Sequence, residues 1–269
     1  MKTTYKIFIL LLVLITSSCE LSKEIDYNTF YEGDRIIVHG FISLQNGVQV
    51  LIKKSVAPNN VLSDDKVQNT IVTLYEDEIA IQQLRKIDDY QYGTELDFAP
   101  DFGKTYSIKI NTENFNETSS NPQPVFMPVS IDSLKIIVED NTNYENLVVW
   151  FTNSNQFGWS YYLKVYYYLN GIIDSSYTGA EIFNPYGLLE NIVVGKNSVE
   201  HQLYNEFDSL KVELYTLSPD LTTFLESLQN YDSSKEDPFF EQTYPVFSNI
   251  IDGYGIFASY SYTTRIVHK

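Results

Sequence analysis

The sequence has very few of the residues on which most catalytic and metal sites depend. It contains one cysteine, Cys19, and three histidines, His39, His201 and His268, in 269 residues. A single cysteine cannot form an intramolecular disulfide or a cysteine-ligated zinc site. The chain also has no metalloprotease, nucleophile-elbow, phosphate-loop or dinucleotide-binding motif. We therefore expect no catalytic residues, no cofactor and no bound metal.

Basic residues and long apolar runs are scarce as well. Lysine and arginine number 18 against 35 aspartate and glutamate residues, which gives a net charge of −17. Such a chain has no general positive field to attract nucleic acid. No run after residue 19 is apolar for long enough to span a bilayer. We expect no nucleic-acid partner and no membrane-spanning segment in the mature protein.

The first nineteen residues have the pattern of a lipoprotein export signal. Two lysines precede an unbroken run of nine apolar residues, Ile7–Ile15, which is followed by Thr16–Ser18 and Cys19. Nine helical residues span about 14 Å, too short for a bilayer core of about 30 Å. Small residues before a cysteine resemble a bacterial lipobox, with Thr16 where leucine is common. Residues 1–18 are therefore predicted to be a cleaved signal peptide, and Cys19 the lipidated residue.

The remaining composition favours strands over helices. The chain has 22 tyrosines and 16 phenylalanines, together with many valine, isoleucine and threonine residues. Short strand-like runs alternate with turn residues, which is typical of β-sandwich domains. We expect a mainly β fold of two β-sandwich-like domains, of the immunoglobulin or fibronectin type. The predicted order is an acidic tether at 19–30, a domain at 31–113, a Pro/Asn/Ser-rich linker at 114–128 and a domain at 129–269.

Two Asn-Gly pairs predict tight hairpins, in which both the asparagine and the glycine take positive φ. The first lies in Gln45–Gly47, between the strand-like runs Arg35–Leu44 and Val48–Ser55. The second is Asn170–Gly171, between Trp159–Leu169 and Ile172–Tyr177. Further strands are predicted at Thr70–Tyr75, Ile79–Leu84, Thr105–Ile110, Ile131–Glu139, Asn146–Thr152, Val199–Tyr204, Ser209–Leu217 and Gly255–Val267.

One helix is predicted near residues 219–230. Ser218 is a suitable N-cap, Pro219 suits the first helical position, and Asp220 complements the helix dipole. The apolar residues that follow recur at helical spacing and end at Leu228. The pattern indicates one short helix within the C-terminal domain, ending near Asn230.

The run of aromatic residues before Asn170 offers a candidate binding surface. Alternation places Trp159, Tyr161, Leu163, Val165 and Tyr167 on one face, which we expect to be core. The other face carries Tyr162, Lys164, Tyr166 and Tyr168, a set that suits stacking on sugar or peptide, or a partner interface. The alternative is cross-strand tyrosine packing on a half-covered sheet, which is the commoner arrangement.

Pairs of neighbouring carboxylates occur at Asp64–Asp65, Asp88–Asp89 and Glu139–Asp140. Two carboxylates can form a glycosidase site, and six or more converging oxygens can hold calcium. No EF-hand-like spacing is present. We therefore expect each pair to lie in a solvated loop.

A series of short motifs in fixed order resembles the family called "domain of unknown function 4249". They are I-V-x-G-x-I at Ile37–Ile42, V-T-L-Y-E at Val72–Glu76, G-K-T-Y-x-I at Gly103–Ile108, I-D-S-L at Ile131–Leu134, S-P-D at Ser218–Asp220, D-P-F at Asp237–Phe239, P-V-F-S-N-I at Pro245–Ile250 and G-x-G-I-F at Gly253–Phe257. His39 departs from the pattern, since asparagine is expected before the glycine.

The resemblance implies a Bacteroidota outer-membrane lipoprotein, encoded beside a TonB-dependent receptor, with no assigned catalytic residues. In that phylum acidic residues after the lipidated cysteine direct surface exposure, and Glu20, Lys23, Glu24 and Asp26 partly resemble such a signal. A three-residue motif that is O-glycosylated in that phylum also occurs twice, with Ser133 and Ser209 as the acceptor residues.

Together with these features, the resemblance implies a surface-facing accessory or ligand-binding lipoprotein that assists a TonB-dependent transporter in nutrient uptake. The alternative is a free-standing surface module for adhesion or structure, which binds a polymer or host ligand. An enzyme is the third and least favoured class.

Overall fold

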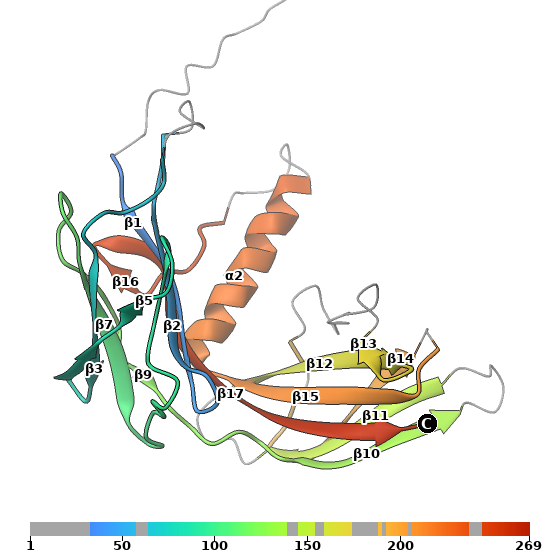
Figure 1. Cartoon of the computed structure of the whole chain (residues 1–269). Helices are drawn as coiled ribbons and strands as arrows, with labels where there is room; N and C mark the ends of the chain where they lie inside the picture. Colours follow the sequence, from blue (N-terminus) through green and yellow to red (C-terminus); the bar gives the residue numbers. More distant parts are fainter. Residues whose placement is uncertain are drawn as a thin grey trace, which may run out of the picture. The chain divides into compact units, whose positions relative to one another are not determined.

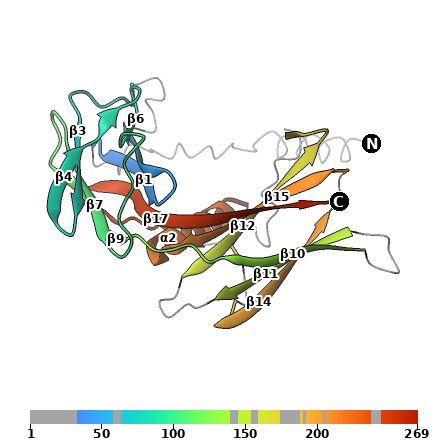
Figure 2. The ribbon, with the colours of Figure 1, turned by 60° about the horizontal axis from the view of Figure 1, so that its bottom comes forward.

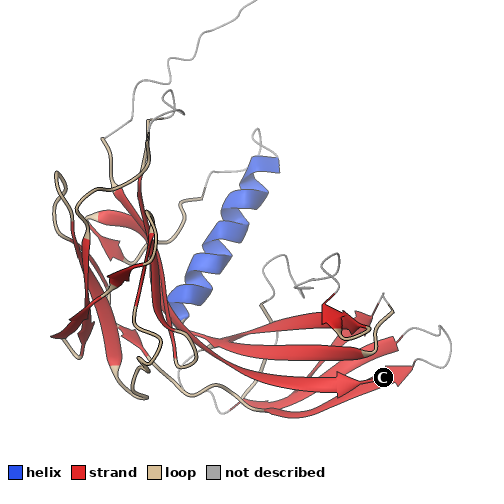
Figure 3. Cartoon of the chain, viewed as in Figure 1, coloured by secondary structure: helices blue, strands red, loops and turns tan. Residues whose placement is uncertain are grey.

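Strands make up most of the described chain, accompanied by the helix α2 (Pro219–Glu236), as Figure 3 shows. The computed structural model describes residues 33–57, 64–138, 145–153, 159–173, 188–189, 192–203, 206–236 and 244–269. Residues Asp34–Lys269 form one compact unit. The prediction of a mainly β, sandwich-like fold with one helix is confirmed.

The largest sheet has eight strands in the order β13-β12-β15-β17-β1-β2-β6-β5. Its strands are β13 (Ile172–Ile173), β12 (Ser160–Leu169), β15 (Ser209–Leu217), β17 (Gly253–His268), β1 (Ile36–Ser43), β2 (Gly47–Lys54), β6 (Gln91–Gly93) and β5 (Arg85–Lys86). Strands from the two ends of the chain are therefore neighbours in one sheet.

Two smaller sheets pack against this large sheet. The six-stranded sheet has the order β16-β8-β7-β3-β4, with β9 also paired to β7. Its strands are β16 (Ile250–Ile251), β8 (Thr118–Ser120), β7 (Thr105–Asn111), β3 (Ile71–Glu76), β4 (Ile79–Gln83) and β9 (Gln123–Pro124). The three-stranded sheet comprises β10 (Ile131–Val138), β11 (Glu145–Asn153) and β14 (Gly195–Leu203).

Each small sheet shares a hydrophobic core with one part of the large sheet. The first core joins β1, β2 and β6 to β3 and β7, with Val38, Ile52 and Ile108 among its fully buried residues. The second core joins β12 and β15 to β10, β11 and β14, which face each other in Figure 2. Both are sheet-on-sheet cores, as expected of β-sandwiches.

The long strand β17 connects the two cores. Its first part pairs in parallel with β1, from Ile36↔Gly253 to Ile42↔Ser259. Its second part pairs antiparallel with β15, so the red strand in Figure 1 runs past both partners. A single strand of 16 residues in the large sheet thus covers part of both cores.

The segment that composition predicts as a linker, residues 114–128, contains the short strands β8 and β9. Side chains of β17 also hold this segment and the residues after it. Ser259 Oγ donates to the Pro124 carbonyl at 2.6 Å and Ser261 Oγ to the Phe126 carbonyl at 2.6 Å. Because β17 alternates faces, every second side chain can reach the next backbone carbonyl. The boundaries of the two predicted domains stay predictions.

Both Asn-Gly turns close hairpins, by different geometries. Asn170 and Gly171 both have positive φ, 54° and 75°, which is the two-residue type I′ pattern. At the first hairpin only Gly47 has positive φ, and Ser43 pairs with Gly47 across a three-residue loop. The expectation that Asn46 also takes positive φ is therefore wrong. The extra loop residue allows the turn to close with glycine alone in the left-handed region.

The helix α2 begins where the sequence predicts. The backbone N–H of Leu221 donates to Ser218 Oγ at 3.4 Å, and Pro219 is the first helical residue. The helix extends to Glu236, beyond the predicted end near Asn230. Apolar periodicity stops at Leu228, but a helix propagates at little cost until a breaker, and the next proline is Pro238.

The helix covers the outer face of the large sheet. Leu221 and Phe224 pack with Ile256 and Ala258 of β17, which are fully buried. The third hydrophobic cluster therefore lies between α2 and the strands β1, β12, β15 and β17, with Tyr162, Tyr215 and Tyr260 packed against it.

Candidate functional site

The predicted anchor and export signal lie outside the described residues. Cys19, Glu20, Lys23, Glu24 and Asp26 all fall within residues 1–32. Their roles stay predictions.

The two faces of β12 are those that the alternating pattern predicts, except that Trp159 lies just before the strand and is half-buried rather than part of the core. Tyr161, Leu163, Val165 and Tyr167 are buried, at most 3% exposed, in the second core. The opposite side chains, including Tyr162, are half-buried.

The polar ends of the buried tyrosines are satisfied inside this core. Tyr161 Oη donates to Asn153 Oδ1 at 2.5 Å, and Tyr167 Oη lies 2.9 Å from His201 Nε2. Burial lowers the pKa of His201 to about 4, so this imidazole is neutral near pH 7.

The outer side of β12 continues into β15 and β17 as a single aromatic surface. Strand register places Tyr162 opposite Tyr215, and Tyr215 opposite Tyr262, while Lys164 stands opposite Glu213. We call this surface the tyrosine face. It consists of Tyr162, Lys164, Tyr166, Tyr168, Lys211, Glu213, Tyr215, Tyr260 and Tyr262.

The rings of the tyrosine face pack on one another around Tyr215. Tyr262 stacks on Tyr215 with ring centroids 5.0 Å apart, and Tyr162 meets its edge at 5.5 Å. The tyrosines therefore pack across strands, which is the alternative to a binding surface that the sequence left open. The rings are nevertheless half-buried rather than buried, and the binding role of this face stays a prediction.

A buried carboxylate organises the polar groups of the face. Glu213 is 4% exposed and accepts hydrogen bonds from Tyr215 Oη at 2.6 Å and Tyr166 Oη at 3.2 Å. Lys211 Nζ forms an ion pair with it at 2.6 Å. Burial alone would raise the pKa of Glu213, but the hydrogen bonds from Lys211 and Tyr215 outweigh it, and the pKa is lowered.

Two ammonium groups flank one ring of the face. Lys164 Nζ lies 4.7 Å and Lys211 Nζ 5.0 Å from the centroid of Tyr166. Cations over an aromatic ring are attracted by its quadrupole. In a chain of charge −17, this face combines two lysines with a single carboxylate. It can therefore offer rings for stacking, hydroxyls for hydrogen bonding and a local positive charge.

Sequence reasoning found four of the nine side chains of the tyrosine face. It missed those of β15 and β17, although Lys211, Glu213 and Tyr215 alternate visibly within a correctly predicted strand. The missing information was strand adjacency, since β12, β15 and β17 are not consecutive in sequence.

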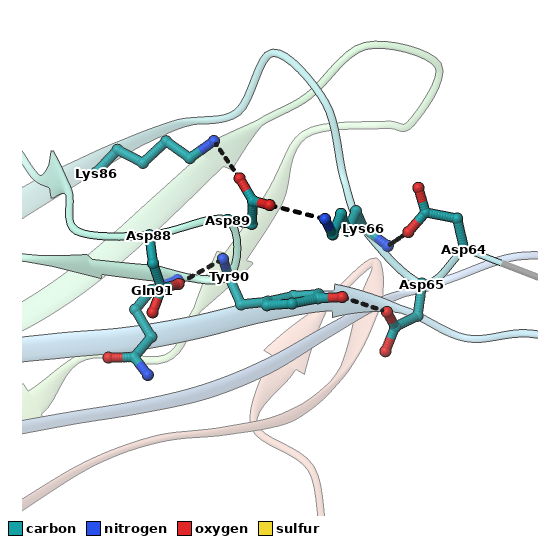
Figure 4. Close-up of polar contacts among 8 residues, drawn as sticks. All are labelled: Asp64, Asp65, Lys66, Lys86, Asp88, Asp89, Tyr90 and Gln91. Atoms are coloured by element: carbon teal, nitrogen blue, oxygen red, sulfur yellow. Dashed lines mark hydrogen bonds and ion pairs between the residues drawn. The ribbon is translucent and has the colours of Figure 1, made fainter.

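A second, charged site surrounds a hollow of about 480 Å³ beside β5 and β6, lined by Lys66, Lys86 and Asp89 among others. Asp89 lies between the two lysines, 2.7 Å from Lys66 Nζ and 3.5 Å from Lys86 Nζ (Figure 4). The hydrogen bond and charge of Lys66 lower the pKa of Asp89. Both lysines are therefore already paired within the protein.

The other carboxylates of this region hold backbone and side chains in place. Asp88 Oδ1 accepts the backbone N–H groups of Tyr90 and Gln91, each at 2.8 Å. Asp65 accepts Tyr90 Oη at 2.9 Å, and that bond is the main cause of its lowered pKa. Asp64, Asp88 and Asp89 are thus exposed loop groups and Asp65 is a half-buried one, each with structural partners (Figure 4). Glu139–Asp140 lies outside the described residues.

The predicted glycosylation acceptors differ in accessibility. Ser133 is exposed in β10, whereas Ser209 is half-buried at the start of β15. Among the residues that the structure describes, no group of three or more His, Cys, Asp and Glu side chains is arranged to hold a metal. Within the same residues, no helix is long and apolar enough to cross a membrane.

Several motifs that are distant in sequence meet in the fold. Asp220 of the S-P-D motif accepts hydrogen bonds from Asn249 and Gln123, both at 2.7 Å. The side-chain amide of Asn249, a residue 3% exposed, also exchanges two hydrogen bonds with the backbone of Phe257 in the G-x-G-I-F motif. A buried polar network therefore joins α2, β9, the residue before β16, and β17.

A comparable contact joins the V-T-L-Y-E and G-K-T-Y motifs. Tyr106 Oη donates to Glu76 Oε2 at 2.7 Å and accepts the backbone N–H of Asp101 at 2.8 Å. A tyrosine near a strand start that binds backbone a few residues upstream is typical of Greek-key sandwiches.

Comparison with known proteins identifies a family for this chain. No curated protein matches the chain. A family model described as "Domain of unknown function (DUF4249)" matches residues 20–266, which is nearly the whole sequence. The chain therefore belongs to this family.

Proposed function

We propose that the protein is an envelope lipoprotein of the Bacteroidota type, held on the outer membrane through Cys19. The observation that carries this proposal is the position of the single cysteine. The family match begins at residue 20, directly after Cys19 and its apolar leader. The compact unit begins at Asp34, so fourteen residues separate it from the cysteine. They can span at most about 50 Å when extended.

We further propose that the protein faces the cell exterior and assists a TonB-dependent receptor in nutrient uptake. Glu20, Lys23, Glu24 and Asp26 support surface export through their resemblance to the known signal. The tyrosine face supports a binding role, because its half-buried rings and two lysines offer stacking and polar contacts together. No catalytic residue is assigned.

Metabolic labelling tests the anchor. Cells fed an alkyne-bearing fatty acid should label the wild-type protein and retain it in the membrane fraction. The Cys19→Ser variant should carry no label, because the substituted residue has no thiol for acyl transfer. Label on this variant would refute the anchor.

Protease treatment of intact cells tests surface exposure. The wild-type protein should be digested. A Glu24→Ala/Asp26→Ala variant should be lipidated but protected, if these acids form the export signal. Equal digestion of the two proteins would show that the signal lies elsewhere.

Purification from gently solubilised outer membrane tests the receptor partnership. The lipidated protein should recover a β-barrel receptor, and Tyr166→Ala should recover less of it. The matched control is Lys135→Ala, an exposed position on β10 outside the tyrosine face. Repeated absence of a barrel from the wild-type preparation would refute the accessory role.

The same surface favours a second candidate, a free-standing module that binds a polymer. The tyrosine face extends over three adjacent strands rather than lining an enclosed pocket. This role predicts retardation of the protein in polysaccharide-containing gels without any barrel partner. Loss of retardation in Tyr166→Ala, together with no receptor recovered, would favour it over the accessory role.

A further inference from the structure

The edge strand β4 differs from the other sheet edges of the described residues. Its sequence, Ile79-Ala80-Ile81-Gln82-Gln83, has no charged residue, and it ends the six-stranded sheet. Ile79 is 69% and Ile81 41% exposed. The outer side of such a strand presents unpaired backbone N–H and C=O groups beside apolar side chains.

The remaining described edges are protected by shortness or by charge. β13 and β16 have two residues each, and β5 consists of Arg85–Lys86. β10 carries Asp132 and Lys135 together with a register shift, and β14 carries Lys196 and Glu200. Protein edges commonly avoid strand addition by these means. Among the edges that the structure describes, only β4 is longer than two residues and without charge.

A register shift within the β3–β4 pair leaves one residue of β4 without a partner in β3. Leu74 pairs with Gln82 and Tyr75 with Ala80, so Ile81 has no Cα partner in β3. A bulge residue is left out of the ladder. The bulge therefore leaves Ile81 of β4 outside the ladder with β3.

The charge at the start of β4 indicates which partner fits. The turn before it contains Asp77, which pairs with Lys104 at 2.6 Å, and Glu76 at the end of β3 accepts the Tyr106 hydroxyl. Glu78 is exposed, and among the described residues it has no hydrogen bond or ion pair. An added antiparallel strand would place its C-terminal end beside this unpaired carboxylate.

We propose that β4 is a docking edge for an extended strand of a partner protein, with alternating apolar residues and a basic residue beside Glu78. Main-chain hydrogen bonds would supply affinity, and the ion pair would set orientation. The proposal deepens the accessory role, because it names a surface for the protein partner. Its test needs neither a lipid anchor nor a receptor, so the docking proposal and the accessory role succeed or fail separately.

A pair of synthetic peptides provides the probe. One is a capped heptapeptide of alternating valine and threonine that ends in lysine, and the other ends in glutamate. Fluorescence anisotropy with the full-length protein should show the lysine peptide binding about threefold more tightly, as exposed ion pairs allow. Glu78→Lys should reverse this preference. Amide hydrogen exchange should slow in residues 79–83 when the lysine peptide is bound.

Substitution on the edge tests where the peptide binds. Ile81→Lys should weaken binding about tenfold, because a lysine on an exposed edge opposes strand addition. The matched control is Ile251→Lys on β16, which is 54% exposed at the opposite end of the same sheet. It should leave binding unchanged.

Three outcomes would overturn the proposal. The first is no saturable binding of either peptide to the wild-type protein. The second is equal weakening by Ile81→Lys and Ile251→Lys. The third is concentration-dependent dimerisation in sedimentation velocity that Ile81→Lys abolishes, which would make a second copy of this chain the occupant of the edge.

Discussion

The carbonyl oxygen of Val38 occupies the space that a side chain at Gly255 would need. An ideal Cβ on Gly255 would stand 2.0 Å from that oxygen, and the residue has a φ of +111°. The two residues are partners in the parallel pairing of β1 with β17. The glycine of the G-x-G-I-F motif therefore permits the N-terminal strand to pair with the C-terminal one.

Replacing Gly255 with alanine should destabilise the protein by about 3 kcal/mol or more, since the clash is with backbone and the φ is unfavourable. Urea denaturation measures the free energy of unfolding. The matched control is Gly103→Ala, which has a φ of +81° and no atom within 4 Å of the added Cβ. It should cost about 1 kcal/mol. Equal losses of stability in the two variants would show that glycine is required at position 255 by backbone conformation and not by the contact with Val38.

Replacing Asn249 with alanine should cost about 2 to 3 kcal/mol. The change removes the amide that bonds to Asp220 and to both backbone groups of Phe257, and buried polar groups are costly to leave unpaired. Asn116→Ala, at an exposed position, should change the free energy of unfolding by less than about 0.5 kcal/mol. A small effect at Asn249 would mean that water replaces its bonds.

Protonation of His201 should destabilise the fold in mild acid. Its pKa is about 4 in the folded state against an ordinary value of 6.5, so the unfolded chain binds the extra proton in the window between these values. Stability is therefore complete above pH 6.5 and falls as the pH drops toward 4, by about 3 kcal/mol in total.

Urea titrations between pH 7.5 and 5 measure this loss above the range in which most carboxylates titrate. His201→Gln should flatten the dependence, whereas His268→Gln, at an exposed position, should leave it as in the wild type. An unchanged slope in His201→Gln would assign the dependence to another group.

Neutralising Glu213 should loosen the tyrosine face. Glu213→Gln removes the ion pair to Lys211 and weakens the hydrogen bonds from Tyr166 and Tyr215, at a cost of about 2 kcal/mol. The pKa of Glu213 is lowered in the folded state, so its stabilisation is present above the ordinary value of 4.5 and is lost as the pH falls through the folded value.

Two measurements check this prediction. The free energy of unfolding at pH 7 should fall in Glu213→Gln and stay within about 0.5 kcal/mol in Glu200→Gln, an exposed position on β14. Tyrosine fluorescence should also change only in the first variant, because the environment of Tyr215 depends on Glu213. Equal stability of the two variants would contradict the role assigned to the buried carboxylate.

The sequence by itself determined the local features of this protein. Alternation in β12 showed which side chains are buried, Asn170–Gly171 showed a tight hairpin, and Ser218 showed where α2 begins. These features depend on residues within a few positions of each other, so sequence patterns contain the necessary information. The end of α2 was predicted less accurately, because the position of a helix end without a strong stop signal depends on small energy differences.

Only the tertiary structure decided which strands become neighbours. Composition marked residues 114–128 as a linker, yet Ser259 and Ser261 bond to carbonyls within it from the other end of the chain. Likewise the outward position of Tyr162 was predicted from the sequence, whereas its pairing with Tyr215 was not. Alternation records whether a side chain faces inward or outward, but pairing between distant strands depends on packing of the whole core. The tyrosine face is therefore a property of the fold, assembled from strands that are each recognisable alone.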